Sequence, residues 1–195
     1  MNTKAAKQFA LDKLNSELDK DLIYHSVEHT LDVVSAARLL GTMEGLFSRD
    51  IALLETAAMY HDIGFTETYE GHEEHSIKIA RKALPKFGYS QDHIQIITGA
   101  IHATKLPQRP QNLMESVLAD SDLDYLGRED MFVIGQRLHY EWSRQGRKMS
   151  LVEWHETQIR FLQKHRYFTK SALRLREARK QKNIRELENL LYREG

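Results

Sequence analysis

Apolar residues recur at helical spacing along most of the chain, and polar residues fill the positions between them. In the first twenty residues, Ala6, Ala10, Leu14 and Leu18 follow one another every four residues and form a stripe on one helix face. Serines in capping positions and glycines at stop positions divide the remaining pattern into segments. The pattern predicts about nine helices, near residues 3–20, 26–41, 48–64, 72–87, 90–105, 112–126, 129–145, 150–165 and 170–192.

No alternating apolar and polar run is long enough to predict a strand. The chain has only three prolines, and two of them lie in the predicted loop Leu106–Pro110. We therefore expect an all-α fold of eight or nine helices. We expect one domain over residues 1–195, with a motif-bearing core at about 22–127 and helices in 128–195 packed on it or extending it.

Composition narrows the chemistry that this chain can perform. Among 195 residues, 28 Lys and Arg balance 28 Asp and Glu, so net charge favours no nucleic-acid partner. The absence of cysteine excludes disulfides, thiolate zinc sites and cysteine nucleophiles. No apolar run approaches the roughly 20 residues that span a bilayer, and the N-terminus lacks the apolar core of a signal peptide. We expect a cytoplasmic protein without a membrane partner.

A basic stretch between Arg174 and Arg185 shares the last predicted helix with an apolar seam at Leu173, Ile184, Leu187 and Leu191. This pattern is typical of a solvated helix packed by one face. A homodimer contact is the second interpretation, and nucleic-acid binding is the third.

His61 and Asp62 stand side by side at the end of the apolar run 51–59. A charged side chain at a buried position is tolerated when it is paired or binds a metal. The alternative is a histidine that caps the C-terminus of a helix, next to a surface aspartate.

Two further clusters contain metal-ligand residue types. His25 and His29 are four residues apart, which places both on one helix face, although a solvated histidine pair has the same spacing. Asp120, Asp122 and Asp124 repel one another, and a cation would relieve that repulsion. A polar helix end is the alternative for the three aspartates. Asp122 is our first choice of ligand, and Asp120 is the second.

The order of a His, a His-Asp doublet and a distant Asp on helices resembles the HD phosphohydrolase superfamily. The resemblance covers about residues 22–127, and Ala57–Gly64 is similar to the core motif of that family. It implies a metal-dependent phosphohydrolase that acts on a phosphomonoester or phosphodiester, such as a nucleotide. The implied cofactor is a divalent ion (Mn, Mg, Fe, Ni, Co or Zn), and the implied ligands are His29, His61, Asp62 and Asp122.

The segment Tyr24–Thr30 also resembles the first motif of the cyclic-nucleotide phosphodiesterases, a branch of the same superfamily. That resemblance implies that His25 is the general acid that protonates the leaving oxygen. The chain departs from the branch at Ser26, where an asparagine is usual, and at Ile63–Thr66, which contains no further histidine. Asp62 is expected to orient the nucleophile, and Lys105 or Arg109 to neutralise phosphate charge.

Three more histidines, His72, His75 and His102, are candidates for a second metal or for substrate phosphate. A solvated helix start is the alternative for His75, and a core or supporting position is the alternative for His102. Two other functions stay open at this point. One is a non-catalytic regulatory module that binds a nucleotide and keeps its metal for structure, and the other is a di-iron HD oxygenase.

Overall fold

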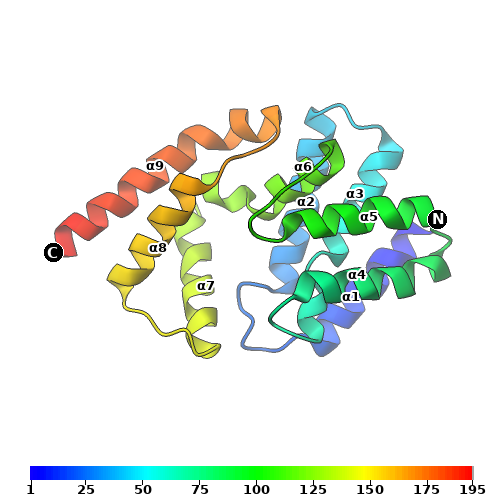
Figure 1. The fold of residues 1–195 in the computed structure, drawn as a ribbon, viewed down its shortest axis with the longest axis horizontal. Helices are drawn as coiled ribbons and strands as arrows, with labels where there is room; N and C mark the ends of the chain where they lie inside the picture. The colour runs from blue at the N-terminus through cyan, green and yellow to red at the C-terminus, as the bar shows by residue number, and fades with distance from the viewer. Residues whose placement is uncertain (195) are drawn as a thin grey trace.

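The computed structural model describes residues 1–194, and within them the chain is all-α with no strand, as predicted. The described residues form nine α-helices and three short 3₁₀ helices (Figure 1). In chain order they are α1 Thr3–Glu17, α2 Val27–Met43, α3 Ser48–Tyr60, η1 Ile63–Thr66, α4 His72–Ala83, η2 Leu84–Phe87, α5 Gln91–Thr104, α6 Leu113–Asp122, η3 Asp124–Gly127, α7 Met131–Arg144, α8 Leu151–Lys164 and α9 Lys170–Glu194.

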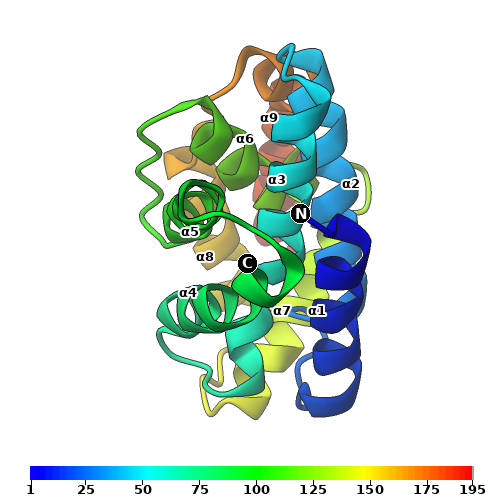
Figure 2. The same cartoon turned by 90° about the vertical axis from the view of Figure 1, so that its right-hand side faces the viewer.

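The helices form two halves that lie next to each other along the long axis (Figure 1). In the N-terminal half, α1 to α6, helix α3 is central and contacts the other five helices (Figure 2). Every residue of α3 from Leu53 to Tyr60 is buried, because neighbours cover the helix on all sides. The C-terminal half, α7 to α9, packs around a separate apolar cluster that includes Met131, Leu162 and Leu187.

Helix α3 ends earlier than its pattern predicts. We expected the helix to continue to Gly64, but it ends at Tyr60 and the chain re-enters a 3₁₀ turn at Ile63. Gly64 allows a close contact between two elements. A Cβ at Gly64 would lie 2.0 Å from the carbonyl oxygen of His72, so only glycine lets η1 pack this closely against the start of α4.

Helix α9 makes more buried polar contacts with the rest of the protein than a solvated basic helix would. The Lys180 side chain is completely buried, and its ammonium group donates a hydrogen bond to the carbonyl oxygen of His165. The Asn183 amide donates to the carbonyl oxygens of Leu126 and Arg128 and so holds α9 against η3. Part of the basic stretch therefore stabilises the fold.

Within the described residues, no helix combines the length and the apolar character that crossing a membrane requires. The prediction of one domain stays a prediction.

Candidate metal centre and adjoining cavity

His29 lies in the first turn of α2, and its position is set by the helix cap. The Ser26 hydroxyl accepts a hydrogen bond from the backbone N–H of His29 at 3.3 Å. The helix therefore begins at Val27, which leaves His25 in the preceding turn and places His29 inside the helix. The two imidazole rings stand edge to face with their centroids 6.2 Å apart, so they need not serve the same task.

His61 follows the last residue of α3 and is fully buried. Its Nδ1–H donates a 2.7 Å hydrogen bond to the carbonyl oxygen of Ala58. In the neutral form of His61, this hydrogen bond favours the tautomer in which Nε2 carries the lone pair. The lone pair of Nε2 is therefore available to a metal ion.

Two carboxylates meet the two imidazoles. The Nε2 atom of His61 lies 3.1 Å from Asp62 Oδ2 and 3.4 Å from Asp122 Oδ1. The Nε2 atom of His29 lies 3.5 Å and 3.2 Å from the same two oxygens. Four ligand atoms from α2, the end of α3 and the end of α6 thus converge on one point.

These distances suit a divalent ion. Metal–ligand bonds of about 2.1 Å separate adjacent ligand atoms by about 3.0 Å in octahedral and about 3.4 Å in tetrahedral geometry. In addition, His61 Nε2 and Asp62 Oδ2 are buried without a hydrogen-bond partner, although unpartnered buried polar atoms are costly. One ligand atom from each of His29, His61 and Asp122 lies within 4.8 Å of the other two. Asp62 Oδ2 lies within 3.5 Å of both imidazole nitrogens and is the fourth candidate ligand.

The electrostatics of the cluster favour a cation at its centre. Burial lowers the pKa of His61, but the charges of Asp62 and Asp122 outweigh burial and hold this pKa well above its ordinary value. Burial raises the pKa of Asp122, but hydrogen bonds from His29 and His61 lower it to about 2. The carboxylates thus remain charged at neutral pH and attract either a proton or a metal ion.

The three clustered aspartates have three different roles. Asp120 is completely buried and accepts hydrogen bonds from the backbone N–H groups of Phe168 and Thr169, so it fixes the segment before α9. Asp124 accepts a 2.7 Å hydrogen bond from Arg176 of α9. Asp122 alone of the three faces His29 and His61, which favours it over Asp120 as the metal ligand.

His25 is held by Glu141, a residue that the sequence did not single out. The Nδ1–H of His25 donates to Glu141 Oε1 at 2.5 Å, and the other carboxylate oxygen accepts the backbone N–H groups of Tyr24 and His25. The Tyr69 hydroxyl donates a further hydrogen bond to Glu141. Burial raises the pKa of Glu141, but the hydrogen bonds from His25 keep it below its usual value.

Glu141 belongs to α7, so it reaches His25 from the C-terminal half. The sequence contains one sign of this role: in the amphipathic segment 131–144, Glu141 lies on the same helix face as the apolar Leu138. Such a face position predicts a buried carboxylate but does not name its partner.

The remaining candidate residues lie either next to the ligand cluster and its cavity or away from them. His72 Nε2 lies 3.4 Å from Asp62 Oδ1, the oxygen that faces away from His29 and His61. His75 pairs with Glu67 instead, and the mostly exposed His102 lies beside Glu74. Lys105 also lies 3.6 Å from Glu74 and lines the cavity described below, whereas Arg109 is exposed and does not line it.

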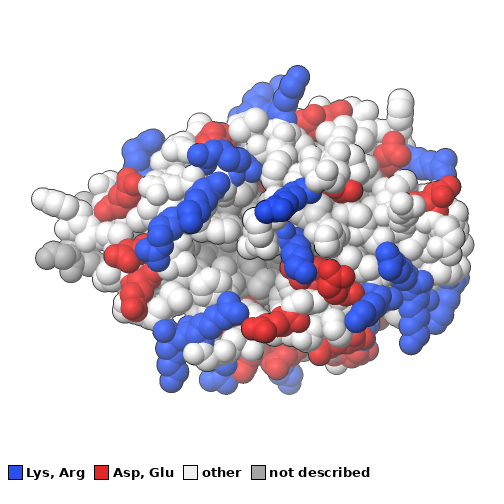
Figure 3. Space-filling view, in the orientation of Figure 1, with Lys and Arg blue, Asp and Glu red and all other residues white. Residues whose placement is uncertain are grey.

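A cavity of about 530 Å³ adjoins the ligand cluster. Asp62, Asp122, His25 and His72 line it together with side chains of η1, α7 and α8. The surface is hollowed between the two halves of the molecule in Figure 3. A small molecule that fills this space would touch both the ligand cluster and the C-terminal helices.

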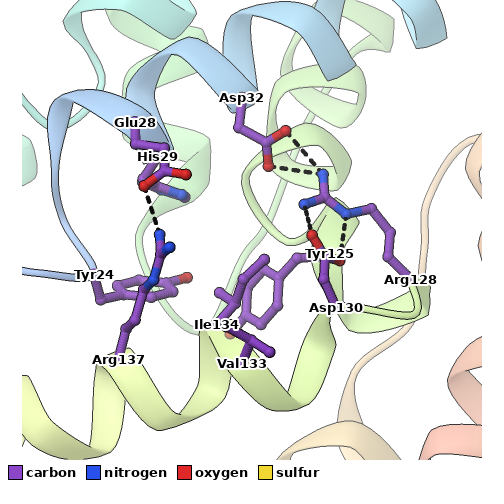
Figure 4. Close-up of a pocket in the computed structure, with 10 residues that line it drawn as sticks. All are labelled: Tyr24, Glu28, His29, Asp32, Tyr125, Arg128, Asp130, Val133, Ile134 and Arg137. Carbon is purple, nitrogen blue, oxygen red and sulfur yellow. Dashed lines mark hydrogen bonds and ion pairs between the residues drawn. The ribbon is translucent and has the colours of Figure 1, made fainter.

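A second, smaller cavity of about 260 Å³ lies between α2 and α7 and reaches His29 from another side (Figure 4). Arg137 of α7 pairs with Glu28 of α2, and Arg128, which lies between η3 and α7, pairs with Asp32 of α2, each at 2.7 Å. Both guanidinium groups are occupied by carboxylates, so this cavity presents no free cation to a phosphate.

Comparison with known proteins gives the class of this chain. Residues 26–126, just over half of the chain, match the HD domain family. A protein of Clostridium beijerinckii, itself uncharacterised, is 34% identical over 110 residues, which cover 52% of this chain and 69% of that protein. The chain belongs to the HD domain family.

Two crystal structures share the fold. One is a predicted HD superfamily hydrolase from an uncultured Thermotogales bacterium, with a TM-score of 0.65, 20% identity, and coverage of 96% of this chain and 92% of that one. The other is a protein from Lactobacillus plantarum, with a TM-score of 0.70, 18% identity, and coverage of 96% and 95%. Both alignments include α7 to α9, so the C-terminal helices lie within the shared fold.

Proposed function

We propose that this protein is a metal-dependent hydrolase of phosphate esters. One observation carries the proposal: each of two imidazole nitrogens lies 3.1–3.5 Å from each of two carboxylate oxygens, beside a cavity that His25 also lines. The similarity to a predicted HD superfamily hydrolase supports the same reaction class.

The four ligands would hold one divalent ion among Mn, Mg, Fe, Co, Ni and Zn, since all of them accept nitrogen and oxygen ligands. When bound, such an ion lowers the pKa of water and withdraws charge from a phosphoryl group. Asp62 also orients the attacking water, through the same carboxylate that faces His61.

His25 supplies the proton that the leaving oxygen needs. Glu141 occupies Nδ1 of His25, so Nε2 is the atom left to face substrate in the cavity. The buried carboxylate of Glu141 holds the imidazole in place while the proton is transferred. Lys105, at the cavity edge, neutralises charge on the phosphate.

His72 extends the centre on its far side. Because it approaches Asp62 Oδ1 while Oδ2 faces the other two histidines, His72 would serve either a second ion or a phosphate oxygen. Metal stoichiometry separates these roles: two equivalents per chain indicate a second ion, and one equivalent indicates phosphate binding.

The direct test is metal content by plasma mass spectrometry on protein purified without chelator or nickel resin, followed by a phosphoester screen with the metal found. We expect one or two equivalents in the wild type, loss of metal and turnover in His61→Ala and Asp62→Ala, and retention of both in His75→Ala. His75 is the matched control because it is a histidine of α4 that pairs with Glu67 outside the cluster.

Metal without turnover of any phosphoester would favour the regulatory module, and a spectrum of a redox-active iron pair would favour the oxygenase.

A further inference from the structure

The cavity beside the ligand cluster has a wall of aromatic side chains from the C-terminal half. Trp142 of α7 and Trp154 and Phe161 of α8 line it, together with Leu138 and Leu162. The Trp154 ring is fixed by a parallel stack on His139 at 5.1 Å and an edge contact with Trp142 at 5.4 Å. This wall is therefore preorganised and presents flat apolar surface.

Phe65 and Tyr69 line the same cavity from the N-terminal half. The Phe65 ring stacks on His25 at 4.1 Å and on His72 at 3.9 Å. Aromatic surface thus continues from the two histidines beside the ligand cluster to the α7–α8 wall. A volume of about 530 Å³ lies in the range of small-molecule sites.

The cavity is poor in cations. Lys105 and Arg147 are the lysine and arginine among the described lining residues, and both lie 3.6 Å from glutamates. Asp62, Asp122 and Glu73 add negative charge. One divalent ion and two partly compensated cations suit a single phosphate group better than a triphosphate.

We propose that the substrate is an ester of one phosphate group whose alcohol carries a flat aromatic ring, and that this ring binds against Trp142, Trp154 and Phe161. This inference rests on the proposed function for the position of the phosphate. The ring site itself is built by α7 and α8, outside the residues that match the HD domain family.

Gln158 gives the wall one oriented polar group. Its amide nitrogen lies 2.2 Å from the position that a Cβ would occupy on Gly135, so the missing side chain of Gly135 makes room for it. The hydrogen bond of this nitrogen goes to the sulfur of Met131 at 4.0 Å, which is a weak acceptor. The Gln158 amide therefore retains hydrogen-bonding capacity for the polar edge of a ring.

Three matched esters test the proposal: 2-(1-naphthyl)ethyl phosphate, its saturated decalin counterpart and propyl phosphate. In all three, the ester oxygen is attached to a saturated carbon chain, so leaving-group reactivity is similar. We expect kcat/KM for the naphthyl ester to exceed that of the propyl ester by at least about tenfold, and that of the decalin ester by severalfold. Equal values for the naphthyl and propyl esters would overturn the proposal, and equal values for the naphthyl and decalin esters would overturn the flat-ring site.

Variants locate the site. Trp142→Leu and Phe161→Leu change half-buried cavity residues, and we expect each to reduce the naphthyl preference at least threefold. The controls are Tyr140→Leu on α7 and Phe168→Leu after α8, which change exposed aromatic residues that do not line the cavity and should leave the preference intact. A preference that survives both cavity variants would place the ring elsewhere.

Adenosine 5′-monophosphate and adenosine 5′-triphosphate test the role of Gln158 and the number of phosphate groups that the site accepts. We expect the monophosphate to have the higher kcat/KM by about tenfold, and Gln158→Leu to lower it for the monophosphate but not for the naphthyl ester. A higher value for the triphosphate would contradict the single-phosphate assignment.

Calorimetry separates this inference from the proposed function. Titration of 2-(1-naphthyl)ethylphosphonate and propylphosphonate measures ring binding without turnover. Preferential binding of the naphthyl compound, lost in Trp142→Leu, would support the ring site even if no ester were hydrolysed. Absence of that preference in a protein that hydrolyses esters would reject the ring site and keep the hydrolase.

Discussion

Two sets of buried polar groups, one in each half of the molecule, serve different purposes. In the N-terminal half, His61 Nε2 and Asp62 Oδ2 are buried without a hydrogen-bond partner and converge with His29 and Asp122. In the C-terminal half, Glu141 accepts four hydrogen bonds and Lys180 is held by a backbone carbonyl and Glu177. Unpartnered groups are ready for a ligand, whereas satisfied groups fix geometry.

The residues that could bind a metal and the residues that position His25 and the substrate come from different parts of this fold. The ligand cluster comes from α2, α3 and α6, while the group that orients His25 and most of the aromatic wall come from α7 and α8.

Asp122 and Asp120 provide the sharpest contrast. They are two residues apart, but Asp122 faces the two histidines and Asp120 fixes the segment before α9. We expect Asp122→Asn to lower kcat/KM by more than about 1,000-fold with little loss of stability, since it removes a charged ligand. Asp120→Asn should retain activity and lower the unfolding free energy by about 1–2 kcal/mol, because one oxygen no longer accepts hydrogen bonds from Thr169. Phosphoester kinetics and urea unfolding measure the two effects, and the reverse pattern would make Asp120 the ligand.

His25 is expected to act in catalysis without holding the metal. We predict that His25→Gln lowers kcat by about 10²- to 10⁴-fold while the metal content stays at the wild-type value. Parallel metal analysis and steady-state kinetics decide the matter. Loss of metal in this variant would reassign His25 to the ligand cluster.

Glu141 should affect rate through His25. In Glu141→Gln the hydrogen-bonded shape is kept and the charge is lost, so we expect kcat to fall by about 10- to 100-fold with KM and metal content unchanged. The double variant with His25→Gln should be no slower than His25→Gln alone. Additive losses in the double variant would show that Glu141 acts independently of His25.

His165 makes the stability of the C-terminal half depend on pH. Burial, and to a smaller extent the charge of Lys180, lowers the pKa of His165 to about 4, compared with 6.5 for an ordinary histidine. Below pH 6.5 the unfolded chain takes up a proton that the folded protein does not, so stability falls as the pH drops from 6.5 toward 4. By linkage, the loss between pH 7.5 and pH 5 is about 2 kcal/mol.

Urea unfolding of the wild type and of His165→Gln across that range isolates this contribution, because the other titrating groups are common to both proteins. We expect the stability curve of the variant to be flatter by about the same amount. Parallel curves for the two proteins would mean that His165 is solvated or paired.

Much of the fold follows from local rules. The Ser26, Ser90 and Ser150 caps begin α2, α5 and α8 where the sequence predicts, because a serine hydroxyl satisfies backbone N–H groups within its own turn. Helix ends were predicted less well. Helices α3, α4 and α6 each stop early and continue as 3₁₀ turns, since tertiary packing decides where those helices end.

The sequence by itself determined the helical class and the residues able to hold a metal, because helical periodicity is local and ligand chemistry belongs to the side chains. Tertiary structure decided which aspartate faces His29, which carboxylate holds His25 and which aromatic rings line the cavity. The first two results join residues 93 and 116 positions apart in the chain, and the third joins side chains that converge on one space. Local periodicity carries no information about such distant partners, since their geometry exists only once the helices pack.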